Sequence, residues 1–361
     1  MKRIKVRLDK NSYEIHIGSG VLQQLGRWLK ENGFRDRVVI ITDLTVKELY
    51  GDGLNYSLSK QGLKVILSVV PDGEEQKSLE TAGRLYEKLA YFRAERLTPV
   101  LALGGGVIGD LAGFVAATYL RGVPLIQIPT TLLAQVDSSI GGKVAVDYGQ
   151  IKNKIGAFYQ PKLVLADVAI LKTLPTAELN NGLAEVIKYA VIREKPFFDY
   201  LEQKLDKIKS LDNKALEEIV YKSARIKVEV VEKDEKDLGL RHILNFGHTV
   251  GHAIESASDF KVSHGQAVAI GMLTASRIAN KLNIFSKDEL MRLRNLIRKA
   301  NLPTEVPDLD VQKVMEVVRQ DKKIAEGKTR FVLPKSIGKV FVSEVSPSLI
   351  EEVLVNWNEE A

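Results

Sequence analysis

Hydrophobic and polar positions follow two different periods along the chain, and the change falls near residue 170. Before it, short segments rich in β-branched residues alternate with amphipathic stretches such as residues 79–94. This alternation is typical of strand–helix–strand units that build a mostly parallel sheet. The predicted strands are Arg37 to Thr42, Lys64 to Val70, Pro99 to Leu103 and Leu125 to Ile128.

The two ends of the chain complete the predicted architecture. Two strand-like segments at the start, Ile4 to Leu8 and Tyr13 to Ile17, are separated by turn residues and predict a hairpin. After residue 175 the pattern is helical, interrupted only at Thr329 to Leu333 and Lys339 to Val345. We therefore expect an α/β domain over residues 1–172 and a mainly α-helical domain over residues 173–361.

Length and composition agree with a globular protein of two domains. The 361 residues are 45% hydrophobic and 27% charged, and they exceed what one average core accommodates. No apolar run approaches the ~20 residues that span a bilayer, and the first residues, Met1 to Val6, lack a signal-peptide core. These features predict a cytoplasmic protein without membrane contact.

Charge and the absence of cysteine narrow the chemistry. The chain has no cysteine, which excludes disulfides, thiolate nucleophiles and cysteine-ligated metals. Its formal charge of +6 is compatible with nucleic acid or with an anionic small molecule, but the lysines and arginines are spread along the chain without a nucleic-acid-binding motif. We therefore expect a phosphorylated or carboxylated small-molecule substrate and no nucleic acid.

Four of the five histidines fall in one short stretch, as His242, His248, His252 and His264. His248 and His252 are four residues apart, so a helix places both on one face, and spacing by itself favours this pair as metal ligands. A catalytic zinc needs three protein ligands, and Glu185, which interrupts the apolar face of a predicted helix, is the best candidate for the third. The alternative is that these histidines are ordinary capping or half-buried residues.

A glycine turn follows the predicted strand 99–103 and precedes a helical segment. Backbone N–H groups in such a turn bind phosphate, which predicts a dinucleotide site, with a tight structural turn as the alternative. The turn comes after the third internal strand and no acidic residue lies ~20 residues on, so we expect a Rossmann-like sheet of atypical strand order. Polar loops after the other strands, at Asp43, Asp72 to Lys77 and Thr130 to Thr131, are expected to face the same crevice.

Several lysines stand among glycine and apolar residues, a setting that is not typical of a solvent-exposed helix or strand face. Lys143 follows Gly141 and Gly142, and Lys152 precedes Asn153 and Lys154. This placement predicts contact with an anion. Further cationic or polar candidates are Lys188, Arg225, Lys227, Arg241, Asn245 and Asp321 to Lys323.

Together these segments resemble the 3-dehydroquinate synthase family over nearly the whole chain. The resemblance rests on Gly104 to Gly106 with Asp110, Arg121 to Pro124, Ile128 to Lys143, Lys152 to Asn153, Gly182 to Glu185 and Asn245 to His248. It implies conversion of 3-deoxy-D-arabino-heptulosonate 7-phosphate into 3-dehydroquinate and phosphate, the second step of the shikimate pathway. It also implies NAD, a divalent metal that is usually zinc and can be cobalt, and a homodimer.

The resemblance also implies a role for individual residues. It makes Glu185, His248 and His264 the metal ligands, and it moves His252 from the metal to the substrate. The other substrate-contacting positions implied are Asp137, Lys143, Lys188, Lys227, Arg241 and Asn245, with Lys152, Asn153 and either Lys322 or Lys323 at the phosphate and Arg121 reaching a partner subunit's site. The NAD-contacting positions implied are Asp43, Asp72, Gly73, Glu74, Glu75, Gln76, Lys77, Gly105, Gly106, Val107, Ile108, Gly109, Asp110, Thr130, Thr131, Lys143, Lys152, Ile170, Leu171, Lys172 and Thr173.

In the implied chemistry, NAD oxidises the substrate transiently, phosphate leaves with the substrate's own phosphate acting as base, the hydride returns, and ring opening and an aldol addition follow. Two rival activities share this architecture: another sugar phosphate cyclase, and a metal-dependent polyol or glycerol-phosphate dehydrogenase. A basic scaffold that binds RNA is the non-catalytic alternative, supported only by the net charge.

Overall fold

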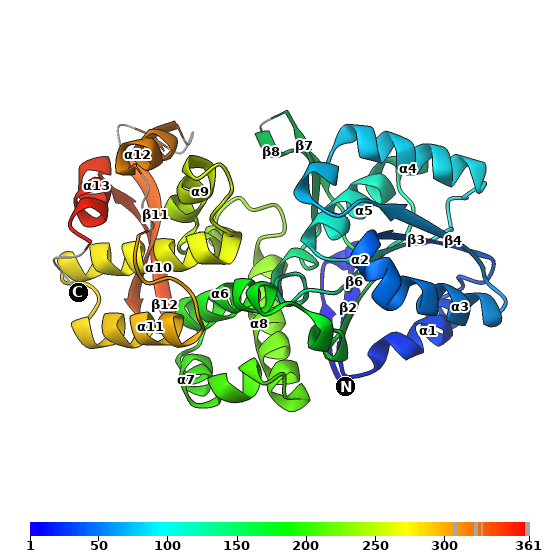
Figure 1. Ribbon diagram of the computed structural model, residues 1–361, viewed down its shortest axis with the longest axis horizontal. Helices are drawn as coiled ribbons and strands as arrows, with labels where there is room; N and C mark the ends of the chain where they lie inside the picture. Colours follow the sequence, from blue (N-terminus) through cyan, green and yellow to red (C-terminus); the bar gives the residue numbers. More distant parts are fainter. Residues whose placement is uncertain (150, 307–309, 321–323, 326–327, 358–361) are drawn as a thin grey trace. The chain divides into compact units, whose positions relative to one another are not determined.

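The computed structural model describes residues 1–149, 151–306, 310–320, 324–325 and 328–357. The chain divides into two compact units, one formed by residues 1–174 and 216–228 and the other by residues 175–215 and 229–361. Helix α8 (Asn213–Lys233) contributes its middle turns to the first unit and its ends to the second (Figure 1). The single boundary expected after residue 172 does not anticipate this exchange.

The first unit is built on a seven-stranded sheet in the order β1-β2-β9-β6-β5-β3-β4. β1 pairs antiparallel with β2, and the other pairings in this sheet are parallel. The N-terminal hairpin and the mostly parallel sheet expected from the sequence are therefore confirmed. The strands are β1 (Lys2–Val6), β2 (Tyr13–Gly18), β3 (Arg37–Asp43), β4 (Lys64–Val70), β5 (Val100–Gly104), β6 (Leu125–Pro129) and β9 (Leu163–Asp167).

The strand order is not that of the standard dinucleotide fold. From β3 onward the order is β4-β3-β5-β6, so the chain reverses its direction of sheet building between β3 and β5. Ligands of open α/β sheets bind at such a switch point, outside the carboxyl ends of the strands. Asp43 ends β3 and the glycine turn ends β5, so both lie at this point.

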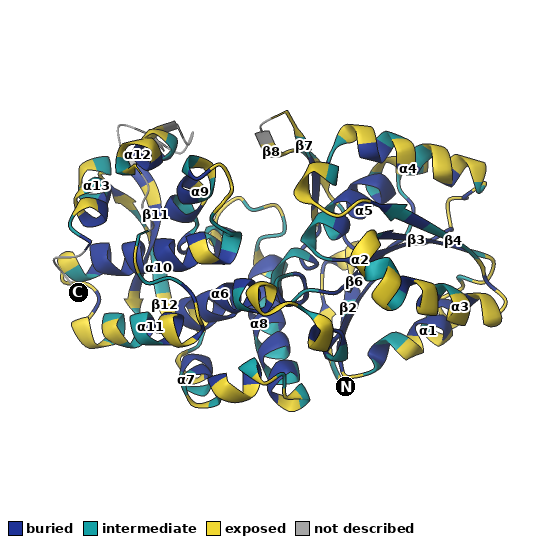
Figure 2. Ribbon diagram, viewed as in Figure 1, coloured by how far each residue is buried: buried dark blue, intermediate teal, exposed yellow. Residues whose placement is uncertain are grey.

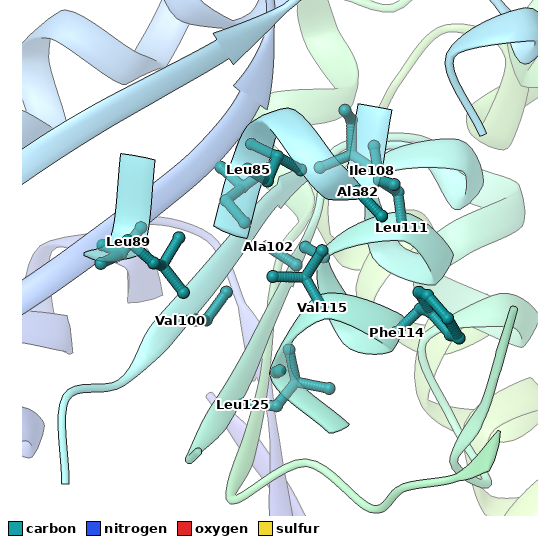
Figure 3. Packing of buried hydrophobic residues seen from close by; sticks show 14 of the residues in the cluster. Ala82, Leu85, Leu89, Val100, Ala102, Ile108, Leu111, Phe114, Val115 and Leu125 are labelled. Atoms are coloured by element: carbon teal, nitrogen blue, oxygen red, sulfur yellow. The ribbon is translucent and has the colours of Figure 1, made fainter. Parts of the chain in front are cut away.

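Helices cover both faces of the sheet because its central strands β3, β5, β6 and β9 are apolar on both sides. Val39 and Ile41 of β3 pack with α4 (Leu79–Tyr91) and α5 (Gly106–Thr118), whereas Val38 and Ile40 point to the opposite face. That face packs with α1 (Leu25–Glu31) and α3 (Asp52–Lys60). Figure 3 shows the first cluster, and Figure 2 shows that the outer sides of α1, α3 and α4 remain exposed.

A second hairpin in this unit was not predicted. β7 (Lys143–Tyr148) pairs antiparallel with β8 (Ile151–Phe158), in a region where the sequence analysis predicts anion-binding lysines and no strand. Val144 and Val146 of β7 are buried against α5. A Cβ on Gly113 of α5 would overlap a methyl group of Val144, so the hairpin lies directly on the helix backbone.

The second unit is mainly helical, as expected. Its centre is α10, in which the residues from Ala267 to Ala279 are all buried, because most of them are apolar or small and Arg277 donates to the Trp357 carbonyl oxygen. The two late strands predicted from the sequence form the hairpin β11–β12. The elements are α6 (Thr176–Arg193), α7 (Lys195–Lys209), α9 (His248–Ala257), α10 (His264–Lys281), α11 (Lys287–Lys299), α12 (Val311–Gln320), β10 (Ile324–Ala325), β11 (Lys328–Ser336), β12 (Lys339–Val345) and α13 (Pro347–Val355).

Among the described residues, no helix combines the length and the apolar character that a bilayer span requires.

The contact between α5 and β7 generates a stability prediction. Gly113→Ala should lower the free energy of unfolding by about 1–3 kcal/mol, because the added methyl group overlaps Val144 in a packed core. Gly83→Ala in α4 is the matched control, since nothing lies within 4 Å of its Cβ position. It should raise the free energy of unfolding by about 0.5–1 kcal/mol through helix propensity. Urea denaturation of both variants measures this, and equal effects would contradict the packing argument.

Candidate metal centre and active site

Glu185 carries a carboxylate with no exposed surface, and three cationic or imidazole side chains surround it. The ammonium of Lys188, one turn further along α6, forms an ion pair with it. His248 Nε2 and His264 Nε2 each lie 3.5 Å from Glu185 Oε1. The ligand atoms of Glu185, His248 and His264 all lie within 4.8 Å of one another.

This geometry fits a metal. Two ligands of a tetrahedral zinc at about 2.1 Å are about 3.4 Å apart, which matches the two 3.5 Å separations and exceeds an ordinary N–H···O hydrogen-bond length. Nitrogen and carboxylate donors are also the ligands that zinc and cobalt accept. The residues present are therefore suited to a divalent transition metal.

The protonation of the two histidines differs. Burial, aided by the positive charge of Lys188, lowers the pKa of His248 well below its ordinary value, so this imidazole is in the neutral form that binds metals. Burial also opposes protonation of His264, but the neighbouring carboxylates of Glu185 and Glu255 outweigh it and raise its pKa to about 10.

Close packing of three helices brings these ligands together. A Cβ on Gly271 of α10 would overlap the carbonyl oxygen of Gly247, which precedes His248, so only glycine lets α9 and α10 approach this closely. Gly265 similarly contacts the backbone of Asn181 on α6. Asn181 Oδ1 accepts hydrogen bonds from Gly265 N–H at 2.7 Å and from Ser263 Oγ at 2.9 Å. Since Asn181 lies one turn before Glu185, this contact sets the start of α10 beside the carboxylate.

Sequence spacing favoured His248 and His252, but the structure groups His248 with His264 instead. His252 is exposed, and its ring centre lies 5.2 Å from that of His248 and 6.1 Å from that of His264. It belongs to a second cluster with Glu255 and the other ring nitrogen of His264. Glu255 Oε2 lies 3.3 Å from His264 Nδ1.

Two residues that contribute to this site were missed by sequence reasoning, Asn181 and Glu255. Both act by holding a ligand in place. The available signal was helical spacing alone, because Asn181 lies four residues before Glu185 and Glu255 lies seven residues after His248.

In the first unit, the predicted nucleotide loops all follow the carboxyl ends of strands of the large sheet. Asp43 Oδ1 accepts a hydrogen bond from Val46 N–H at the start of α2 (Leu44–Val46), and Asp72 accepts one from Thr45 N–H. Gly105 precedes α5 with extended backbone, which leaves the N-terminus of that helix directed at the switch point. Among the remaining predicted positions, Ile108, Ile170 and Leu171 are buried, whereas Gly73, Glu74, Glu75 and Lys172 are exposed.

Lys77 is the most enclosed charge among these loops. Its Nζ lies 2.7 Å from Asp110 Oδ2 and 2.6 Å from Asn153 Oδ1. Burial lowers the pKa of Lys77, but the attraction of Asp110 outweighs it and leaves a net increase, so the ammonium stays charged. Lys77 was predicted beside NAD, and the structure also joins it to the hairpin β7–β8.

The predicted anion-binding residues of the first unit lie on that hairpin and on α8. Lys143 begins β7 and is exposed, and Lys152 on β8 lies 3.4 Å from Glu74. Lys227 on α8 donates hydrogen bonds of 2.8 Å to the carbonyl oxygen and to Oδ1 of Asp137. Two pairs of predicted residues, Lys77 with Asn153 and Lys227 with Asp137, are thus in direct contact.

In the second unit, Lys188 belongs to the metal cluster, and the buried Arg241 donates a 2.8 Å hydrogen bond to the Glu235 carbonyl. Asn245 ends the short helical segment Leu240–Asn245, three residues before His248. Arg121 of the first unit is exposed on a turn after α5. Lys322 and Lys323 lie outside the described residues.

Two family models match adjoining parts of the chain. The model described as 3-dehydroquinate synthase N-terminal matches residues 67–181, and the one described as 3-dehydroquinate synthase C-terminal matches residues 182–324. The 3-dehydroquinate synthase of Desulforamulus reducens is 51% identical over 342 residues, covering 94% of this chain and 95% of the relative.

Solved structures give the same picture. 2-Deoxy-scyllo-inosose synthase complexed with carbaglucose-6-phosphate, NAD⁺ and Co²⁺ has a TM-score of 0.91 at 28% identity, covering 98% of this chain and 99% of that one. The 2-epi-5-epi-valiolone synthase from Streptomyces hygroscopicus, with NAD⁺ and Zn²⁺ bound, has a TM-score of 0.90, again at 28% identity and with coverages of 98% and 99%.

The grouping of ligands predicts how metal binding responds to substitution. Glu185→Ala, His248→Ala and His264→Ala should each lower the affinity for zinc by more than about 100-fold, because each removes one of three protein ligands. His252→Ala should keep its metal and lose turnover. Competition with a chromophoric chelator measures the affinities. A metal-free His252→Ala protein alongside a loaded His264→Ala protein would reverse the assignment.

Proposed function

The chain belongs to the 3-dehydroquinate synthase family, and from this premise we propose which of its residues perform the reaction. The enzyme converts 3-deoxy-D-arabino-heptulosonate 7-phosphate into 3-dehydroquinate and inorganic phosphate, a step of the shikimate pathway to the aromatic amino acids. It uses NAD and a divalent metal.

We assign the metal to Glu185, His248 and His264, and NAD to the loops at the carboxyl ends of β3, β4, β5, β6 and β9. When bound, the metal polarises the substrate hydroxyl that is oxidised, and NAD takes up and returns the hydride. The remaining tasks fall to the protein: it must bind the substrate's carboxylate, hydroxyl and phosphate groups and hold them in one orientation.

The observation that carries this proposal is the contact between the hairpin β7–β8 and the nucleotide loop 72–77. Lys152 lies beside Glu74, and Asn153 accepts a hydrogen bond from Lys77. A cationic segment that we propose binds phosphate therefore touches the proposed nucleotide loop. A reaction that expels phosphate from an oxidised intermediate needs that combination, whereas oxidation of a neutral polyol does not.

The proposed substrate contacts in the second unit have fixed orientations. Lys188 is held by Glu185, and Arg241 by the Glu235 carbonyl, so neither side chain must be ordered when substrate binds. His252 is exposed beside His248 and His264, which suits a proton carrier next to the metal. The remaining proposed contacts are Asp137, Lys143, Lys227, Asn245 and Lys322.

The rival activities are less well supported. The chain is 51% identical to a 3-dehydroquinate synthase and 28% identical to 2-deoxy-scyllo-inosose synthase and 2-epi-5-epi-valiolone synthase, which are named for other products. A dehydrogenase that acts on a neutral polyol would leave the proposed phosphate-binding hairpin without a task. A cytoplasmic location stays a prediction.

The proposed reaction predicts a characteristic balance of products. Incubation with the heptulosonate phosphate, NAD and zinc should release one phosphate per substrate consumed, while NADH does not accumulate, because oxidation and reduction occur at one site. Phosphate is measured colorimetrically and NADH by its absorbance. Sustained production of NADH would assign the chain to the dehydrogenases.

We also propose that Arg121 completes the site of a partner subunit in a homodimer. Arg121 and the preceding Leu120 both adopt left-handed backbone conformations, with φ of 66° and 49°. Such conformations are costly for non-glycine residues and cluster at functional positions. The turn presents an exposed guanidinium, which suits bidentate binding of a phosphate or carboxylate.

Mixing two inactive variants tests this role. If Arg121 acts across subunits, Arg121→Ala mixed with Lys152→Ala should regain about a quarter of the wild-type activity at equal amounts, because one site of each heterodimer has no lesion. Subunit exchange must be confirmed independently, for example with two affinity tags. No recovery after exchange would place Arg121 in its own subunit's site or on the surface.

A further inference from the structure

Lys77 occupies an unusual position, because it ends the nucleotide loop and yet its side chain is almost entirely enclosed. The side chain is 6% exposed, and its Nζ has two protein acceptors, Asp110 Oδ2 at 2.7 Å and Asn153 Oδ1 at 2.6 Å. Asp110 lies in the first turns of α5, next to the glycine turn, and Asn153 lies on β8. One ammonium group therefore joins a nucleotide-binding helix to the phosphate-binding hairpin.

The contact also fixes the direction of the Asn153 amide. An ammonium group has hydrogen-bond donors and no acceptor, so the amide oxygen must face Lys77. The two N–H bonds of the amide nitrogen then point away from Lys77. The main chain of Asn153 is equally constrained, since its N–H donates to Asp147 Oδ1 at 2.7 Å and its φ is 57°.

The backbone of the nucleotide loop is attached to the same hairpin. The N–H of Asp147 on β7 donates a 2.7 Å hydrogen bond to the carbonyl oxygen of Lys77, and Ser78 forms a parallel bridge with Asp147. Asp147 thus accepts a hydrogen bond from the Asn153 N–H with its carboxylate and donates one to the Lys77 carbonyl oxygen with its own N–H. Lys77 therefore takes part in two contacts between the nucleotide loop and the hairpin, and Glu74 with Lys152 forms a third.

We propose that Lys77 is a positioning residue that aims the Asn153 amide at the substrate phosphate and couples binding of NAD to binding of phosphate. This inference rests on the proposed function, in which Asn153 contacts phosphate and loop 72–77 contacts NAD. Order imposed on the loop by NAD is transmitted through Lys77 to the hairpin, and a phosphate on the hairpin has the reciprocal effect. If the role of Lys77 were only to neutralise Asp110, its replacement would not change the effect of phosphate on the affinity for NAD.

The direct test measures NAD affinity by titration calorimetry, with and without saturating inorganic phosphate, in zinc-loaded protein. In the wild type, phosphate should tighten NAD binding about 5- to 10-fold, which lies within the usual range for coupled sites. In Lys77→Met this ratio should fall to about one. Lys64→Met removes an exposed lysine of β4 and should keep the wild-type ratio. A wild-type ratio of one, or an unchanged ratio in Lys77→Met, would overturn the proposal.

A kinetic cycle separates positioning from folding. Lys77→Met and Asn153→Ala should each raise KM for the substrate by about tenfold or more. The KM of the double variant should not exceed that of the more impaired single variant, because both substitutions remove the same interaction. Effects that multiply would contradict action through Asn153. If Lys77→Met fails to fold because Asp110 is left buried without its cation, Lys77→Met with Asp110→Asn replaces it, and the same loss of the phosphate-dependent ratio is expected.

These binding measurements do not depend on turnover. Accumulation of NADH by the wild type would refute the proposed reaction while leaving the NAD–phosphate coupling measurable, and a correct product balance with unchanged coupling in Lys77→Met would refute only the role of Lys77.

Discussion

Burial of the Glu185 carboxylate is the constraint on which the second unit depends. Removing an ion from water costs several kcal/mol even after the protein relaxes, so such a charge persists only where cations or a metal surround it. Lys188, His248 and His264 supply that environment from three helices. The helices must approach closely for both imidazoles to reach one carboxylate oxygen. Gly265 and Gly271 permit this approach, because a Cβ at either position would overlap the neighbouring backbone. The apolar surroundings of α10 then hold the arrangement rigid.

In the first unit it is cations that are enclosed, and oxygen atoms of other side chains surround them. Lys77 is enclosed between Asp110 and Asn153, and Lys227 is held by Asp137. In each pair, the partners are separated by at least 33 residues of sequence, and every one of these residues was expected at the active site. In these two clusters the enclosed charges belong to groups that we propose act on the ligands, and their mutual contacts fix their positions before a ligand arrives.

The sequence predicted the elements whose hydrophobic period is strong. The apolar segments at residues 37–42 and 99–103, alternating with amphipathic stretches, indicated a mostly parallel sheet, and the helical second unit followed from its hydrophobic period. The hairpin β7–β8 was missed because Gly141 and Gly142 precede it, Gly149 lies between its strands, and lysines interrupt its pattern. For the metal, the spacing of residues within one helix favoured His252. Such spacing contains no information on the position of α10, whose first residue is His264. The likeness to a known family selected His264, and the structure brings that residue to Glu185. Asn181 and Glu255 could not be predicted, because their role consists of contacts between helices.

The most direct test of the account is a crystal structure of the zinc-loaded protein with anomalous diffraction recorded at the zinc edge. If Glu185, His248 and His264 hold the metal, one strong peak lies about 2.0–2.2 Å from a Glu185 carboxylate oxygen and from Nε2 of both His248 and His264. A peak held instead by His252, Glu255 and Nδ1 of His264, with the Glu185 carboxylate bound only to Lys188, would contradict it.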